Sequence, residues 1–306
     1  MSMDPHSIVS ESTFLPTIEL PRTLERPPAT SDSISRLGLD AIAPELVDVP
    51  LPYIHHQIAL QTERMLVGLR DLPLPRALPR LRLQEFLPIA EADLPSHDGE
   101  PPIYPTHVLA VSLPSESILT GTSTYASEQD AMLTLVPIHG IVFAANCASQ
   151  ILRPVPQPEP TTDKGDADPL ILPVCPVCLP SVDALLVLRT YMYTKRVDAL
   201  FADSIPLFDD NDDHELPAHK TADLKSESPP SSADTRALHL ATRLARRPGF
   251  TLTHILKCAS GVLDVWKTAW CIGLEVQHHT EFWDTVDLAW EVMILTLNLV
   301  GAENSS

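Results

Sequence analysis

Residues 172–202 read LPVCPVCLPSVDALLVLRTYMYTKRVDALFA and carry the signals of one strand followed by two helices. The apolar run over 170–180 is short and interrupted by prolines, which is typical of a strand and excludes a helix. Ser181 stands where a helix N-cap belongs, and Asp183 falls in the first turn, where the helix dipole favours negative charge. This helix is predicted to end at a polar corner formed by Tyr193, Thr194, Lys195 and Arg196, and a second short helix to follow over 197–203.

Two more strands and a short helix are predicted upstream of this segment. Residues 107–113, HVLAVSL, favour a strand, and a second strand is expected from Met132 to Val136, ended by Pro137. Residues 138–148, IHGIVFAANCA, are apolar nearly all round, as in a short buried helix. The pattern predicts an α+β fold whose core is a short mixed sheet flanked by helices.

The last part of the chain has the period of amphipathic helices. A helix over 236–247 is expected to stop at Pro248, after which Thr251 or Thr253 caps a long helix. Thr280 is expected to cap a final helix that ends near Gly301. We expect the two long helices to form an antiparallel pair, and their predicted inward stripes contain all four tryptophans. In the first helix the stripe is Leu252, Ile255, Leu256, Ala259, Val262, Leu263, Trp266 and Trp270; in the second it is Phe282, Trp283, Val286, Ala289, Trp290, Met293 and Leu297.

Proline content divides the 306 residues into a loop-rich front and a helix-compatible rear, because 23 of the 31 prolines precede residue 171. The predicted organisation has five parts. Residues 1–50 are expected to be mostly disordered or a loop draped on the core, 51–103 to hold a helix and a Pro-rich connector, and 104–206 to form the core with a Pro-rich insertion at 153–169. Residues 207–235 form an acidic disordered loop, and 236–301 form helices that pack on the core.

Composition excludes several classes of function. The formal net charge of −19 repels phosphate backbones, so direct nucleic-acid binding is not expected. We find no uncharged apolar run of the roughly 18 residues that a membrane span needs, and no secretory signal at the amino terminus. Five cysteines, an odd number, fit free thiols in a reducing intracellular compartment, nuclear or cytoplasmic, better than a disulfide framework.

Catalytic motifs are missing from the sequence. GxSxG, GxGxxG and GxxxxGK[ST] do not occur, so we expect neither an enzyme nor a cofactor. Cys175 and Cys178 form a CxxC motif, which we interpret as free cysteines in a strand, while zinc binding and redox chemistry remain alternatives. A zinc site would need two further ligands, and the nearest candidates are His139 and Cys147.

Two stretches resemble known families. VPIHGIVFAANCA at 136–148, preceded by THVLAVSL, and residues 172–202 give the order strand, H-x-x-V-x-A-A helix, LPV, and a helix ending in Tyr-Met-Tyr-Thr-Lys-Arg. This order resembles the BTB/POZ fold, with Lys195 where that fold has a tight-turn glycine. More closely, the segments resemble the basidiomycete fungal clampless proteins, named for a requirement in clamp-cell formation during sexual development. The resemblance implies a regulatory protein in the mating-type pathway and no catalytic residues.

The leading hypothesis is therefore a non-enzymatic protein-interaction regulator of fungal sexual development. The expected partners are proteins, such as mating-type homeodomain or other transcription factors, and not membranes or small-molecule substrates. We expect the partner surface at Tyr193, Lys195 and Arg196, together with whatever part of Trp266 and Trp270 stays uncovered. The alternatives are a zinc- or thiol-dependent protein that uses the CxxC motif, and a transcriptional cofactor that acts through DNA-bound partners.

Overall fold

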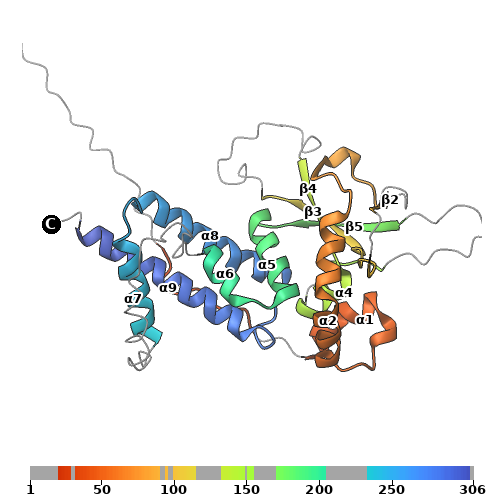
Figure 1. The fold of residues 1–306 in the computed structure, drawn as a ribbon, viewed down its shortest axis with the longest axis horizontal. Coiled ribbons are helices and arrows are strands. Elements are labelled where there is room, and N and C mark those ends of the chain that lie inside the picture. The colour runs from red at the N-terminus through yellow and green to blue at the C-terminus, as the bar shows by residue number, and fades with distance from the viewer. Residues whose placement is uncertain are drawn as a thin grey trace, which may run out of the picture.

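The computed structural model describes residues 20–28, 32–89, 94–95, 99–114, 132–148, 150–154, 170–204 and 233–303. Within these residues the fold is α+β, as predicted, with one five-stranded mixed sheet and eight α-helices. The sheet lies at one end of an elongated molecule beside α1, α2 and α4, the helices α7, α8 and α9 lie at the other end, and α5 and α6 lie between them (Figure 1).

The sheet has the order β1-β4-β3-β5-β2. Its long strands are β3 (His107–Ser112), β4 (Met132–Ile138) and β5 (Leu170–Cys178), and its two edge strands are β1 (Ala77–Pro79) and β2 (Phe86–Ile89). β3 and β4 are antiparallel, whereas β3 and β5 are parallel, with Val108 opposite Val174. Parallel neighbours need a crossover connection, and here the chain between β4 and β5 contains α4 (Gly140–Asn146).

Both faces of the sheet are buried, which explains why its central strand is apolar from Val108 to Val111. Leu109 and Val111 of β3 belong to the main core, while Val108 and Ala110, which alternate with them, belong to a second core. Leucines of the segment between α2 and β2, such as Leu74, Leu78 and Leu83, cover the second face. The Pro-rich connector is thus the outer layer of the sheet.

Prolines lie inside the strands, contrary to the prediction that Pro137 ends β4. Pro137 pairs with Val108, and β4 continues to Ile138. β1 pairs with β4 only at residues 132–134, so β4 has an open edge at Pro137 and no neighbour there needs the missing N–H. In β5, residues 170–173 pair with β2 and residues 174–178 pair with β3, so Pro173 and Pro176 each have one open side.

The helices that cover the main core begin and end near the predicted residues. α2 (Leu51–Asp71) precedes the connector, and α5 (Val182–Thr194) follows β5. Ser181 caps α5 by accepting a hydrogen bond from the backbone N–H of Ala184 at 3.2 Å. Lys195 ends α5 in the left-handed conformation at φ 52°, which is the conformation that favours glycine, and α6 (Val197–Ser204) follows.

Three helices form the far end of the molecule. α7 (Ala233–Ala245) and α8 (Leu252–Ile272) both pack against α9 (Thr280–Glu303), and α8 also contacts α5. Three details of the prediction are wrong. Gly301 does not end α9, Leu252 is 48% exposed because it opens α8, and Trp270 is 41% exposed at the other end of that helix.

By length and composition alone, α9 could cross a membrane, since its Thr280–Ala302 segment has a mean hydropathy of 1.4. The search for uncharged runs in the sequence did not find this segment. In the structure 33% of this apolar window is buried inside the protein, and Trp283 and Met293 are among the fully buried residues of α9.

The amino-terminal segment is more ordered than predicted. α1 (Asp32–Ile42) packs against α4, its Leu39 is fully buried, and a short 3-10 helix follows at Pro44–Leu46. A second 3-10 helix lies at Arg80–Arg82 in the connector. The expectation of disorder over 1–50 is therefore wrong for residues 32–50. Residues 1–19, most of the Pro-rich insertion and nearly all of the acidic loop lie outside the described residues.

Candidate functional site

Tyr193 is buried, so the prediction that it belongs to an exposed partner surface is wrong. Its hydroxyl lies 2.7 Å from Nδ1 of His139 and accepts the backbone N–H of His139 at 3.0 Å. Nε2 of His139 lies 2.9 Å from the carbonyl oxygen of Ile103, which can only accept, so Nε2 carries the proton and the tyrosine hydroxyl donates to Nδ1. Burial lowers the pKa of His139 to about 4. This neutral histidine ties the end of α5 to the start of α4.

Tyr193→Phe is expected to lower the free energy of unfolding by about 1–3 kcal/mol, because it leaves two buried groups of His139 without partners. Tyr53→Phe is the matched control, since Tyr53 is 56% exposed and should lose little. Urea unfolding of both variants measures the difference. Equal stabilities would show that the bridge contributes nothing.

Lys195 and Arg196 are the other two residues predicted at this corner. Their charged groups differ in direction and in the groups that they contact. The ammonium group of Lys195 turns inward to Oδ1 of Asn146 and lies 5.5 Å from the centroid of the Tyr191 ring. Burial of this ammonium lowers the pKa of Lys195 to about 8. Lys195 is nevertheless an exposed residue, so it stays a predicted contact residue. Arg196 is exposed and pairs with the exposed Asp198 at 2.6 Å, so it stays a predicted contact residue.

A cluster of polar side chains surrounds the Lys195 ammonium where α2, α4, α5 and the α8–α9 connection meet. His55 of α2 lies 2.7 Å from the carbonyl oxygen of Ala145, and His279 lies 3.2 Å from the hydroxyl of Tyr191. His278 pairs with the buried Glu275 at 3.2 Å. Burial lowers the pKa values of His55 and His279, and the positive charge of Lys195 lowers both further. The cluster joins the sheet-bearing part of the chain to its carboxyl-terminal helices.

His107 forms a further buried connection, which joins β3 to residue Arg153 and to the start of α4. Its Nε2 lies 2.7 Å from the carbonyl oxygen of Arg153 and donates to it, so its Nδ1 accepts the hydroxyl of Thr106 at 2.8 Å. The same hydroxyl accepts the N–H of Gly140 at 2.8 Å, at the start of α4. A Cβ on Gly140 would lie 2.5 Å from the His107 ring, so only glycine fits at this approach. Burial lowers the pKa of His107.

The four candidate metal ligands do not converge. Cys175 and Cys178 are three residues apart on β5, so their side chains leave opposite faces, one buried and one exposed. Cys147 is buried with its sulfur 3.7 Å from that of Met192, and His139 is used in the bond to Tyr193. Burial raises the pKa values of Cys147 and Cys175, which keeps both as thiols. No group of three His, Cys, Asp or Glu side chains that could hold a metal occurs in the part of the chain that the structure describes.

The tryptophans divide into two buried and two more accessible residues. Trp283 and Trp290 are core residues, whereas Trp266 and Trp270 lie side by side on α8 with ring centroids 5.8 Å apart. The indole N–H of Trp266 donates to the carbonyl oxygen of Glu25 at 2.9 Å, so the amino-terminal segment partly covers it. Trp270 remains exposed and stays a predicted contact residue.

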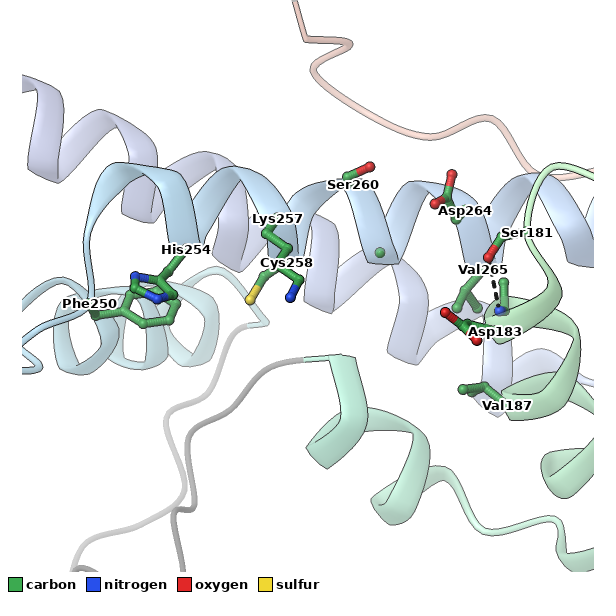
Figure 2. A pocket seen from close by; sticks show the side chains of 12 residues that line it. Ser181, Asp183, Val187, Phe250, His254, Lys257, Cys258, Ser260, Asp264 and Val265 are labelled. Carbon is green, nitrogen blue, oxygen red and sulfur yellow. Dashed lines mark hydrogen bonds between the residues drawn. The ribbon is translucent and has the colours of Figure 1, made fainter. Parts of the chain in front are cut away.

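A groove of about 540 Å³ lies between the start of α5 and α8 (Figure 2). Val187 and Val265 line its apolar part, while Asp183, Lys257 and Asp264 bring charges of both signs. Of its nucleophilic side chains, Ser181 caps α5, burial raises the pKa of the Cys258 thiol, and Ser260 is exposed on α8. His254 stacks on Phe250 and bonds Thr251 at 2.8 Å, where it caps α8.

Sequence reasoning missed the residues that connect distant parts of the chain. No connecting role was predicted for His55 or His279, His107 was predicted only as part of a strand, and Asn146 only as part of an apolar helix. Arg26, which donates to Asp284 and Asp287, was assigned to a disordered segment. The signal that could have found Arg26 is the placement of two aspartates one turn apart beside the tryptophans of α9.

Comparison with known proteins gives one match. Residues 27–180 match the family model of the Clampless protein 1 N-terminal domain. This range starts ahead of α1, runs through α2, the whole sheet and α4, and ends just before α5. No curated protein and no solved structure matches the chain.

Proposed function

The chain belongs to the clampless protein family, and from this premise we propose that it is a non-enzymatic regulator of clamp-cell formation that works by binding other proteins. The family assignment supports the role in clamp-cell development. Mating-type homeodomain proteins and other transcription factors are the proposed partner class.

The non-enzymatic proposal is supported by the buried histidines, whose ring nitrogens form hydrogen bonds between segments of the chain. His139, His107 and His55 each bond a backbone carbonyl of a different segment, and burial keeps them neutral. A general base needs a free nitrogen that can reach a substrate, and these nitrogens already hold the protein together. The buried thiols of Cys147 and Cys175 are likewise enclosed by the core.

We further infer a BTB/POZ-like core with α8 and α9 as an antiparallel helix pair. The inference is supported by the order of elements: the hairpin β3–β4, then α4, then β5 parallel to β3, then α5. Lys195 in the left-handed conformation also stands where that fold has glycine. The likeness is one of fold and carries no partner by itself.

Complementation of a basidiomycete strain that lacks the gene tests the function. Cys178→Ser, which removes the exposed thiol of the CxxC motif, is expected to restore clamp cells as fully as the wild-type protein. The double variant Arg196→Glu with Trp270→Ala, which alters two exposed residues, is expected to restore fewer clamp cells and to recover fewer proteins from mating cells.

The two variants separate the alternatives. Loss of clamp cells with Cys178→Ser, together with loss of stoichiometric zinc from the purified protein, would favour the metal or thiol function and contradict the proposal. Full activity of the double variant would show only that the partner surface lies elsewhere. Failure of the wild-type gene to restore clamp cells would contradict the role itself.

A further inference from the structure

Residues 20–28, which we name the strap, cross α8 and α9 without forming a helix or strand, and they are seen as the red trace beside these helices (Figure 1). Two indole N–H groups hold the main chain of the strap. Trp266 donates to the carbonyl oxygen of Glu25 at 2.9 Å, and Trp290 donates to that of Pro21 at 3.0 Å. Bonds to backbone carbonyls do not depend on the side chains of the bound segment, so they fit any extended peptide.

Two side chains of the strap add specificity. Arg26 spans two carboxylates one turn apart on α9, with Nε 2.8 Å from Asp287 Oδ2 and Nη2 2.6 Å from Asp284 Oδ1. Leu24, two residues earlier, is the one strap residue that is buried, at 8% exposure. The helices therefore select an apolar residue followed two positions later by arginine.

The strap does not fill the groove in which it lies. A cavity of about 410 Å³ remains between Arg22, Thr23 and Leu24 on one side and α9 on the other. Its α9 wall carries Asp287 and Glu291, one turn apart, and the apolar Ile294 and Leu295. The space is thus acidic and partly apolar, and it offers contacts that the strap does not use.

The ion pairs of the strap are partly open to solvent. The Arg26 side chain is 33% exposed and that of Asp284 is 60% exposed, so water and salt screen this pair. A longer basic segment that also entered the cavity would make the same bonds and add apolar contact. The advantage of the strap over such a segment is its high effective concentration at the groove, because it is part of the same chain.

We propose that the groove between the strap-binding faces of α8 and α9 binds an extended segment of a partner protein with the pattern apolar–x–Arg, and that the strap occupies this groove until the partner displaces it. This inference deepens the proposed function, on which it rests, by naming a site and the chemistry of the partner. The acidic groove selects a basic segment by charge, and the indoles hold its backbone.

Binding of a fluorescent peptide to the full-length protein tests the proposal. The peptide copies residues 17–29, TIELPRTLERPPA. Arg26→Ala in the protein weakens the strap and should raise the affinity for the peptide about tenfold or more over wild type, because the groove is then vacant more often. Arg80→Ala is the matched control, since Arg80 is an exposed arginine of the Pro-rich connector outside the strap and its groove, and it should behave as wild type.

Further variants test whether peptide binding depends on the two aspartates of α9 and on the arginine of the peptide. Adding Asp284→Asn and Asp287→Asn to the Arg26→Ala protein should abolish binding, as should replacing the arginine at position 26 of the peptide by alanine. Thermal melts followed by circular dichroism verify that all variants are folded. Equal affinity of wild-type and Arg26→Ala protein, or binding that survives loss of both aspartates, would overturn the proposal.

Sedimentation analysis distinguishes the occupant. A wild-type dimer that the peptide dissociates would assign the groove to the strap of a second copy and overturn the choice of a separate partner. These measurements use purified protein, so their failure leaves the clamp-cell complementation result unaffected.

Discussion

Gly68→Ala is expected to lower the free energy of unfolding by about 3 kcal/mol or more, the upper end of the range for overpacking. A Cβ at Gly68 of α2 would lie 1.9 Å from the carbonyl oxygen of Ile103 and 2.6 Å from its carbonyl carbon. These are backbone atoms, so the whole loop would have to move. The same carbonyl oxygen accepts a hydrogen bond from Nε2–H of His139, so a shift of the loop also breaks that hydrogen bond.

Helix propensity opposes this loss but does not outweigh it. Alanine is better than glycine in a helix interior by about 1 kcal/mol, less than the expected cost of the clash. Gly261→Ala is the matched control, because a Cβ there meets nothing within 4 Å. We expect Gly261→Ala to be neutral or to gain up to about 1 kcal/mol in urea unfolding. Similar stabilities of the two variants would show that α2 and the loop are not in close contact.

Acid is expected to produce the second large effect, a loss of stability between pH 6.5 and about 4. An unfolded histidine binds a proton near pH 6.5, whereas burial lowers the pKa of His139 to about 4 in the folded protein. Within this window the unfolded state binds more protons, so stability falls as the pH falls. His139 alone contributes a loss of about 3 kcal/mol across it. His55, His107 and His279 act in the same direction, because burial lowers their pKa values as well.

Urea unfolding at several values between pH 7 and pH 5 measures this slope while most carboxylates remain ionised. His139→Gln should lower the stability at pH 7 and flatten the slope. His56→Gln should change neither, since His56 is exposed on the opposite side of α2 from its buried neighbours. A slope that His139→Gln leaves unchanged would contradict the assignment of a neutral, buried histidine.

Local patterns predicted the elements whose signals lie close together in the sequence. Ser181 caps α5 and Thr251 caps α8, because a cap and the apolar stripe after it lie within a few residues of each other. Thr280 was predicted to cap α9 but is its first residue, and its hydroxyl donates to the carbonyl oxygen of Val276 at 3.4 Å. α1 was missed because its order comes from packing on α4, more than 90 residues later in the chain. β1 and β2 were missed because strands of three or four residues have too few positions to show alternation.

The site residues were harder to predict because their partners are far apart in the sequence. Tyr193 is the last residue but one of α5, and nothing near it in the sequence indicates that its hydroxyl bonds His139. The bonds from Arg26 and Trp290 span more than 250 residues. Arg196, next to a lysine whose ammonium turns inward, was placed correctly at the surface because its ion pair with Asp198 is local.

The two outer strands of the sheet each contain a proline, Pro79 in β1 and Pro88 in β2, and neither strand exceeds four residues. A foreign strand can add to a sheet only where free N–H and C=O groups follow one another along an edge strand. Short edge strands in which one proline lacks the backbone N–H make a poor template for such addition. The sheet of this acidic chain is thereby protected from joining the sheet of a second copy edge to edge.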